Sequence, residues 1–241
     1  MAVCRSLIAG HPNEKKRQVK QIVAYETKKP LAIAPRSHKV GSMTDTAFND
    51  LSSLGSYLKT RRSSRPRNMT APGPSDAELR DFVATAIRTP DHGKLSPWRV
   101  VQVDLDQRAA LAQGFIEAYR ADKPDAGRLE IEGLEKIAHE APALLVVLFS
   151  PISSTKIPVW EQELSTGAFC MNILHAIHEK GFVGGWITGW PAYSDRVRDM
   201  FGGASEKIAG FLYAGTAREP LEERGRPDLD RIFGKWDPAG H

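Results

Sequence analysis

The chain has 241 residues, of which 41% are hydrophobic and 26% are charged, and this is the composition of an ordinary globular protein with one domain-sized core. Its longest apolar run, Ala143–Phe149, is too short to cross a membrane, and its two cysteines are too few for a disulfide framework. The composition therefore excludes an integral membrane protein and a disulfide-stapled secreted domain, and it favours the reducing cytoplasm.

The formal net charge of +4 is unevenly distributed along the chain. Residues 1–42 hold nine Lys or Arg and two acidic residues, whereas residues 43–241 hold 24 and 27. A nucleic-acid binder normally carries its positive charge on the folded domain. The mildly acidic body therefore argues against nucleic acid as a partner. A basic nucleic-acid or membrane-surface binder that uses residues 1–67 is kept as the alternative from another functional class.

Residues 1–42 are irregular and poor in aromatic residues, with the solvated stretches KKRQVK, KKP and APRSHK. We predict that they form a disordered basic tail or result from an upstream start codon; a transit peptide is a further alternative, because acidic residues are scarce. Residues 43–241 are predicted to form a single domain.

The first predicted helix, Ala47–Thr60, leads into an arginine-rich cluster, KTRRSSRPR at Lys59–Arg67. This cluster could meet a nucleic-acid backbone or one tightly held phosphate group. A second helix is predicted within Pro74–Arg88, where Ser75 precedes Glu78 by the three residues of a capping box.

The later segments combine strands and helices without strict alternation, which favours an α+β sandwich. The predicted helix Trp160–Lys180 is apolar nearly all round, so it must be central or lie at a subunit interface. The predicted strands are Trp98–Asp104, Ala143–Phe149 and Gly210–Thr216, and the other predicted helices are Asp106–Arg120, Arg128–Glu140 and a short one near Ser194–Phe201.

Several common sites are missing from the sequence. It contains no GxxxxGK[ST] phosphate loop, no GxGxxG after a strand and no GxSxG elbow. His175 and His178 lie three apart on a predicted helix, but no complete ligand set surrounds them, so no metal is expected. Glu161 and Glu163 lie two apart and face different sides of the helix, which argues against a paired-carboxylate site.

Three separated segments carry the functional signal: the arginine cluster, the loop RTPDHGKLSPWRVV at Arg88–Val101, and GFVGGWITG at Gly181–Gly189. The order RRS, PDHG..SPW, WEQE, GGWITG and FLYAGT resembles the nitroreductase family, and within it the short, minimal branch with a PDH motif. The resemblance extends from Ser53 to Trp236. It implies an FMN-dependent homodimer with a three-layer sandwich, in which helices flank a central, mostly antiparallel sheet.

The resemblance implies that Arg61, Arg62 and Ser63 hold the FMN phosphate. Guanidinium forks and a hydroxyl suit a dianion, because charge-assisted bonds are roughly twice as strong as neutral ones. The alternative is a solvated helix end without a ligand. Arg224 and Arg226 are left without an assigned role, although late basic residues contribute to phosphate binding in larger members of the family.

The resemblance places Arg88 and His92 beside the flavin ring and its ribityl chain, where a cation would stabilise negative charge on the ring. His92 could instead be a loop histidine bonded to backbone. The sequence departs here from the commoner pattern PS..N.QPW: Asp91 and His92 replace the serine, and Ser96 stands where glutamine is usual. The asparagine is missing, so the hydrogen bonds at the ring edge are not assigned.

The glycine-rich segment is implied to bring the backbone amides of Gly184 and Gly185 close to flavin N5. Trp186, Ile187 and Thr188 would flank the isoalloxazine and leave one face open for stacking. A tight glycine turn into a strand is the alternative. In the closest relatives the end of the preceding helix is associated with the nicotinamide nucleotide, which here corresponds to Ala176, Ile177, His178, Glu179, Lys180 and Gly181.

The function implied is a ping-pong reaction in which NADH or NADPH passes a hydride to FMN at the subunit interface. A nitroaromatic, a quinone or a similar acceptor is then reduced. No catalytic side chain is expected, because the flavin carries the chemistry. The same scaffold also serves dehalogenases, desaturases and flavin destructases, and these remain alternatives. The sequence indicates neither the physiological acceptor nor the preferred nicotinamide.

Overall fold

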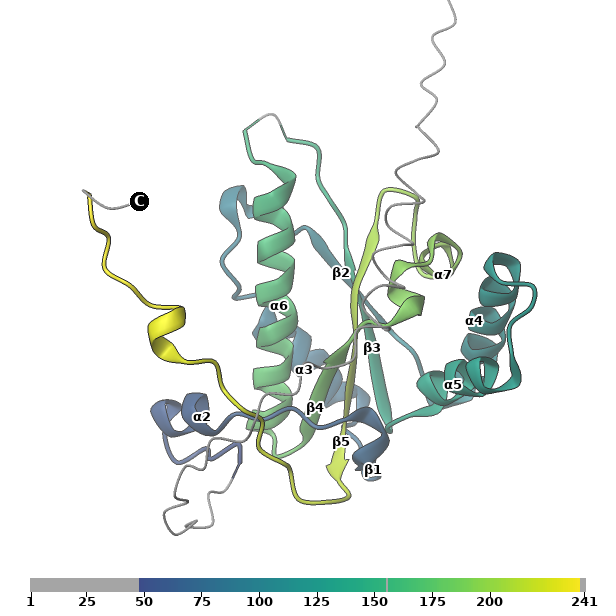
Figure 1. Ribbon diagram of the computed structural model, residues 1–241, viewed down its shortest axis with the longest axis horizontal. Helices are drawn as coiled ribbons and strands as arrows, with labels where there is room; N and C mark the ends of the chain where they lie inside the picture. The colour runs from purple at the N-terminus through teal and green to yellow at the C-terminus, as the bar shows by residue number, and fades with distance from the viewer. Residues whose placement is uncertain (1–47, 155, 239–241) are drawn as a thin grey trace, which may run out of the picture. The chain divides into compact units, whose positions relative to one another are not determined.

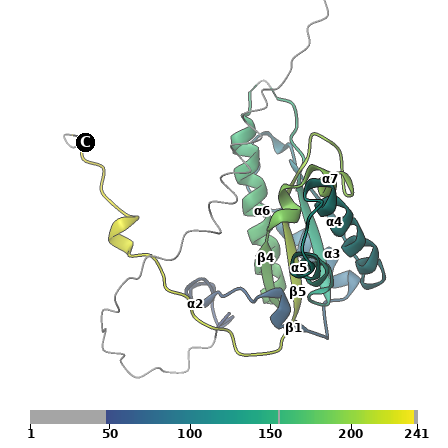
Figure 2. The ribbon, with the colours of Figure 1, turned by 45° about the vertical axis from the view of Figure 1, so that its right-hand side comes forward.

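The computed structural model describes residues 48–154 and 156–238. The predicted tail, residues 1–42, lies outside these ranges. In the described part of the chain, one sheet lies between two layers of helices (Figures 1 and 2). The predicted α+β sandwich with flanking helices is thereby confirmed, whereas the homodimer stays a prediction.

The sheet is organised around its longest strand, β5 (Lys207–Ala217). One edge of β5 pairs with β3 (Ala143–Phe149), and β3 pairs in turn with β2 (Trp98–Gln102). β5 also pairs with β4 (Val183–Ile187) and, near its C-terminal end, with β1 (Met69–Thr70). All four pairings are antiparallel. The arginine segment leads into β1, which pairs with β5 at residues 216 and 217, next to residues 211–215 that pair with β4.

Helices α3 (Asp76–Ala86) and α6 (Val159–Glu179) cover one face of the sheet, and α4 (Arg108–Asp122), α5 (Arg128–His139) and α7 (Asp195–Asp199) lie on the other side (Figure 1). The remaining α-helix of the described ranges, α2 (Leu54–Thr60), lies close to the C-terminal end of α6. Single 3₁₀ turns cover Pro66–Asn68, His92–Lys94, Leu105–Gln107, Trp190–Tyr193 and Leu229–Arg231.

The strand β3 forms the centre of two hydrophobic cores. Leu144, Val146 and Leu148 belong to the core on the α4 side, while Leu145 and Val147 belong to the core that contains α6. Every residue of β3 is buried. The prediction of a strand that is buried on both faces is confirmed, with the predicted bounds. None of the helices in the described ranges combines the length and apolar character that a membrane span needs.

Local signals define two of the helix starts. Both halves of the capping box at α3 are present, since Glu78 N donates to Ser75 Oγ (3.4 Å) and Ser75 N donates to a Glu78 carboxylate oxygen (2.8 Å). The predicted helix Ala47–Thr60 was too long: α2 begins at Leu54, because Ser53 caps it with its hydroxyl. Residues 48–49 and 51–52 lie in turns, and Ala47 lies outside the described residues.

Candidate functional site

The helix α2 ends at the arginine segment, and Asn49 holds the first turn of that segment. Arg61 is the C-cap residue of α2, and its guanidinium donates to the hydroxyl of Ser63 (3.1 Å). The side chain of Asn49 accepts from Arg62 N (2.8 Å) and donates to Arg62 O (3.2 Å). The guanidinium Nε of Arg62 donates to the carbonyl of Glu222 (2.5 Å). The three predicted phosphate-binding residues therefore lie together, next to the C-terminal segment.

A second pair of arginines joins this segment from the far end of the chain. Burial and then the positive charges of Arg224 and Arg226 lower the pKa of Arg62. Arg226 pairs with Glu223 (2.9 Å). With Arg61 the group holds four arginines and one paired carboxylate, an excess of positive charge that a bound anion would relieve. Spacing along the chain offered no reason to join Arg224 to Arg62.

The arginine segment also touches the glycine-rich strand. Ser64 N donates to Gly184 O (3.0 Å). A Cβ atom on Gly185 would lie 2.5 Å from Ser64 O, and one on Gly184 would lie 2.9 Å from Leu174 Cδ2. The structure thus brings together the two segments that were expected to share a ligand. Both glycines are explained by close packing within the chain, because a side chain at either position would collide with protein atoms.

Beyond the glycines, β4 rises to the surface. Trp186 is 37% exposed, and its indole N–H donates to Ala209 O (3.0 Å). The indole lies over Gly210, where a Cβ atom would come within 2.0 Å of Nε1. Ile187 and Thr188 are half-buried. The indole N–H is therefore bonded to the backbone of β5, and the exposed part of the ring can contact a ligand or another chain.

Beneath the glycine strand lies a hydrogen-bonded group of one tyrosine and two histidines, of which Tyr57 and His178 are buried and His175 is half-buried. Tyr57 Oη lies 2.7 Å from His175 Nδ1 and 2.9 Å from His178 Nδ1, and His178 Nε2 accepts from Gly184 N (3.2 Å). His178 is 1% exposed. Burial, followed by the charge of Arg61, lowers the pKa of His178 to about 4. Burial raises the pKa of Tyr57 to about 12. Both groups are therefore neutral at neutral pH.

The residues predicted for the nicotinamide nucleotide divide into two sets. Ala176, Ile177 and His178 are buried, whereas Glu179, Lys180 and Gly181 are exposed. Lys180 forms ion pairs with Asp81 (3.5 Å) and Glu179 (3.2 Å). Only the end of this segment faces solvent.

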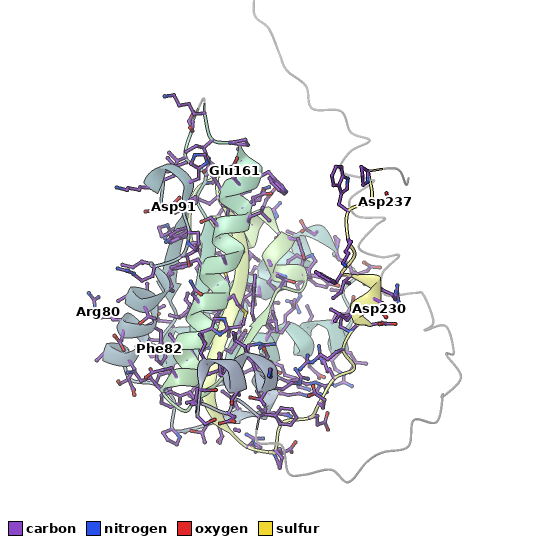
Figure 3. The ribbon with its side chains drawn as sticks, turned by 90° about the vertical axis from the view of Figure 1, so that its left-hand side faces the viewer. Arg80, Phe82, Asp91, Glu161, Asp230 and Asp237 are labelled. Atoms are coloured by element: carbon purple, nitrogen blue, oxygen red, sulfur yellow. The ribbon has the colours of Figure 1, made fainter. Side chains whose placement is uncertain are left out.

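The loop that carries His92 lies at the opposite end of α6. His92 Nδ1 contacts a carboxylate oxygen of Glu161 (2.7 Å), and Figure 3 shows Asp91 and Glu161 at the same end of that helix. Glu161 and His178 are 17 residues apart on α6, so His92 is separated from His178 by about 25 Å along the helix axis.

Arg88 lies between these two ends. It is exposed just after α3, and its neighbour Thr89 accepts a hydrogen bond from Asn172 Nδ2 (2.6 Å), part-way along α6. Within one copy of the chain, the arginine and glycine segments are therefore in contact, whereas His92 lies far from both of them. Within the described ranges no three metal-ligating side chains gather in one place.

The family model described as "Nitroreductase family" matches residues 58–216, most of the described chain. This chain belongs to the nitroreductase family. The "Putative NAD(P)H nitroreductase YdjA" of Escherichia coli K12 is 32% identical over 171 residues, which are 69% of this chain and 88% of that protein. The resemblance read from the motif order is thereby confirmed.

Solved structures share the nitroreductase fold. A nitroreductase-like family protein from Bacillus cereus has a TM-score of 0.66 at 20% identity and covers 79% of this chain and 100% of its own. A point mutant of NfnB, an FMN- and NADPH-dependent nitroreductase from "sphigopyxis sp. strain HMH", has a TM-score of 0.61 at 20% identity, over 77% of this chain and 99% of its own.

Proposed function

We propose that this nitroreductase-family protein is an FMN-dependent oxidoreductase that uses NADH or NADPH to reduce nitroaromatic, quinone or similar acceptors. The observation that carries the proposal is the contact of the arginine segment with the glycine strand, made by Ser64 N and Gly184 O (3.0 Å). A bound FMN would supply the redox chemistry, which is the transfer of a hydride from the nicotinamide to the acceptor, and we propose a ping-pong order for it. The names of the relatives support this activity.

The phosphate of FMN would be held by Arg61, Arg62 and Ser63. Their donors suit a phosphate, since two guanidinium groups and a hydroxyl can bond several phosphate oxygens at once. Arg224 and Arg226 raise the local positive charge further, and after burial their charges are the next causes that lower the pKa of Arg62. A dianion in this position would offset their mutual repulsion.

The ring of FMN would lie along β4. The amide of Gly184 is already donated to His178, and Gly185 is buried against Ser64. We therefore assign these glycines to the floor of the ring site. The exposed face of Trp186, with Ile187 and Thr188, would flank the ring. This arrangement leaves the outer face of the ring for a nicotinamide or an acceptor to stack in turn.

The nicotinamide nucleotide would reach this site past the end of α6. Of the residues predicted for it, Glu179, Lys180 and Gly181 are at the surface. The ammonium group of Lys180 can attract a nucleotide phosphate, although two carboxylates compete for it.

A second copy of the chain would complete the site. Arg88 and His92 were expected beside the flavin, yet His92 lies about 25 Å along α6 from His178, further than one FMN can bridge. A twofold axis crossing the middle of α6 would set the N-terminal end of one helix beside the C-terminal end of the other. The His92 loop of the partner would then meet the arginine segment of the first copy.

Exposed apolar side chains support such an interface. They lie on α6 and on α2, and large exposed apolar patches mark contact surfaces. The side chains concerned are Val159, Trp160, Leu164, Leu54 and Leu58. We therefore propose a homodimer with FMN at the subunit interface.

The decisive experiment compares two double substitutions within the same cluster. Arg61→Ala with Arg62→Ala should yield folded but colourless protein, with the Kd for FMN raised at least about a hundredfold through loss of two charge-assisted contacts. Arg65→Ala with Arg67→Ala removes the same charge from exposed positions and should leave FMN binding within about threefold of the wild type.

The measurements are FMN content, Kd by fluorescence quenching, and loss of the flavin absorbance band when NADH or NADPH is added without oxygen. Two results would contradict the proposal: wild-type protein that binds no FMN on reconstitution, and full retention of FMN by the Arg61, Arg62 double variant.

A further inference from the structure

The outer edge of β4 at Gly184 is closed by a side chain and by the arginine segment. In the described ranges β4 pairs with β5 on one edge. On the other edge Gly184 O accepts from Ser64 N, while Gly184 N donates to His178 Nε2 (3.2 Å). Buried backbone groups at a strand edge need such partners. His178 therefore accepts a hydrogen bond from the Gly184 amide, which the sheet leaves without a partner.

The hydrogen bonds determine where the proton of His178 lies. A backbone amide can only donate, so Nε2 of His178 must be the bare nitrogen and Nδ1 must carry the proton. Nδ1–H then donates to Tyr57 Oη (2.9 Å), and the Tyr57 hydroxyl donates to His175 Nδ1 (2.7 Å). This chain of bonds ends at a backbone amide, which cannot pass a proton on. Its role is therefore to hold geometry.

The same tyrosine is fixed to the arginine segment. Tyr57 lies one helical turn before Arg61, whose backbone N–H donates to Tyr57 O (2.7 Å). One buried unit thus joins α2, which ends in the arginines, to α6 and to the glycine strand.

We propose that Tyr57 and His178 are positioning residues that hold the β4 backbone at a fixed separation from the arginine segment. This inference rests on the proposed function, because it concerns the two ends of the FMN site. Loosening the unit would let the glycine floor move relative to the phosphate site, which weakens FMN binding although neither residue contacts the cofactor.

The charged and titratable groups around His178 favour the protonation state that the unit needs. Arg61, His175 and Tyr57 face it. Burial and then the cation of Arg61 lower the pKa of His178 to about 4, so the ring stays neutral across the physiological range. A charged imidazole would present a second N–H to the amide of Gly184 and lose that bond.

Two substitutions at His178 separate the effect of its hydrogen-bond acceptor from the effect of its size. His178→Gln can place an amide oxygen where Nε2 lies and accept from Gly184, whereas His178→Asn is too short to reach it. Tyr57→Phe keeps the ring and removes only the hydroxyl. Tyr213→Phe is the matched control, because its buried hydroxyl donates to Ile137 O (2.6 Å) in the other core.

Two readouts are needed: hydrogen exchange of the Gly184 amide by NMR, and the Kd for FMN. We expect His178→Asn to raise both the exchange rate and the Kd about tenfold or more, and His178→Gln to stay within about threefold of the wild type. Tyr57→Phe should raise both by about three- to tenfold, while Tyr213→Phe leaves the FMN Kd unchanged.

Imidazole nitrogen shifts of the wild type should show the Nδ1–H form of His178, and the Nε2–H form would overturn the inference. Equal FMN affinity of the wild type, His178→Asn and Tyr57→Phe would overturn it as well. If His178→Asn does not fold, Tyr57→Phe and the nitrogen shifts decide the question. Wild-type protein that binds no FMN would instead refute the proposed function, and the shifts and the Gly184 exchange would still test the buried unit.

Discussion

The contact between Gly185 and the arginine segment makes the substitution Gly185→Ala the sharpest test of the site's construction. The new Cβ atom would lie 2.5 Å from Ser64 O and 3.3 Å from Met69 Cε, whereas ordinary contacts begin at 3.4 Å. The strand and the arginine segment must therefore separate by about 0.9 Å at this point. Because Ser64 also donates to Gly184, that movement breaks the backbone bond joining the two segments.

The expected loss of stability follows from these contacts. Overpacking costs about 1–3 kcal/mol, and the lost backbone hydrogen bond costs about 1 kcal/mol. The reduced entropy of the unfolded chain returns about 0.4–1 kcal/mol. The free energy of unfolding should therefore fall by about 1–3.5 kcal/mol, and FMN should bind about tenfold more weakly because the two parts of its site are displaced.

Urea denaturation of the apo and FMN-loaded protein measures this effect. Gly133→Ala on α5 is the control, since a Cβ atom there meets nothing within 4 Å. It should stabilise the protein by up to about 1 kcal/mol through helix propensity. If the two substitutions change the free energy of unfolding by the same amount, the steric reasoning for Gly185 is wrong.

Three further substitutions test other parts of the structure. The hydrogen bond from Arg99, together with those from Ser150 and from Gly203 N, lowers the pKa of the Glu206 carboxyl to about 2. Because the pKa is depressed in the folded state, the carboxylate contributes to folding stability above pH 4.5, and this contribution is lost as the pH falls toward 2. Glu206→Gln should cost about 1–2 kcal/mol at pH 7 and little near pH 2 in acid-unfolding curves, and an equal cost at both pH values would refute this. Gly210→Ala should displace the indole of Trp186, with about 1–3 kcal/mol of destabilisation and a shifted tryptophan emission, and an unchanged spectrum would contradict the packing. Arg224→Ala should weaken FMN binding about three- to tenfold and make it less sensitive to salt, and an unaltered Kd would remove Arg224 from the phosphate site.

Several elements were determined by sequence alone, because their signals are local. The apolar run Ala143–Phe149 formed a strand with the predicted bounds, since a run that avoids water on both faces must lie inside a sheet. The Ser75 capping box closed as its spacing predicted. The order of the short motifs was enough to indicate the nitroreductase family, which the family model confirmed over residues 58–216.

The partners of the polar groups were decided by the tertiary structure. His178 was expected near a nucleotide, but the fold buries it against Tyr57, which lies 121 residues earlier in the chain. The C-terminal arginines come close to Arg62 only because the segment after β5 turns back to the end of α2. Hydrophobic periodicity reports which side chains leave water, but it carries no information on which distant donor and acceptor then meet. The pairing of distant donors and acceptors depends on strand order and helix length. The helix α6 is long enough to place His92 near one of its ends and the arginine segment near the other.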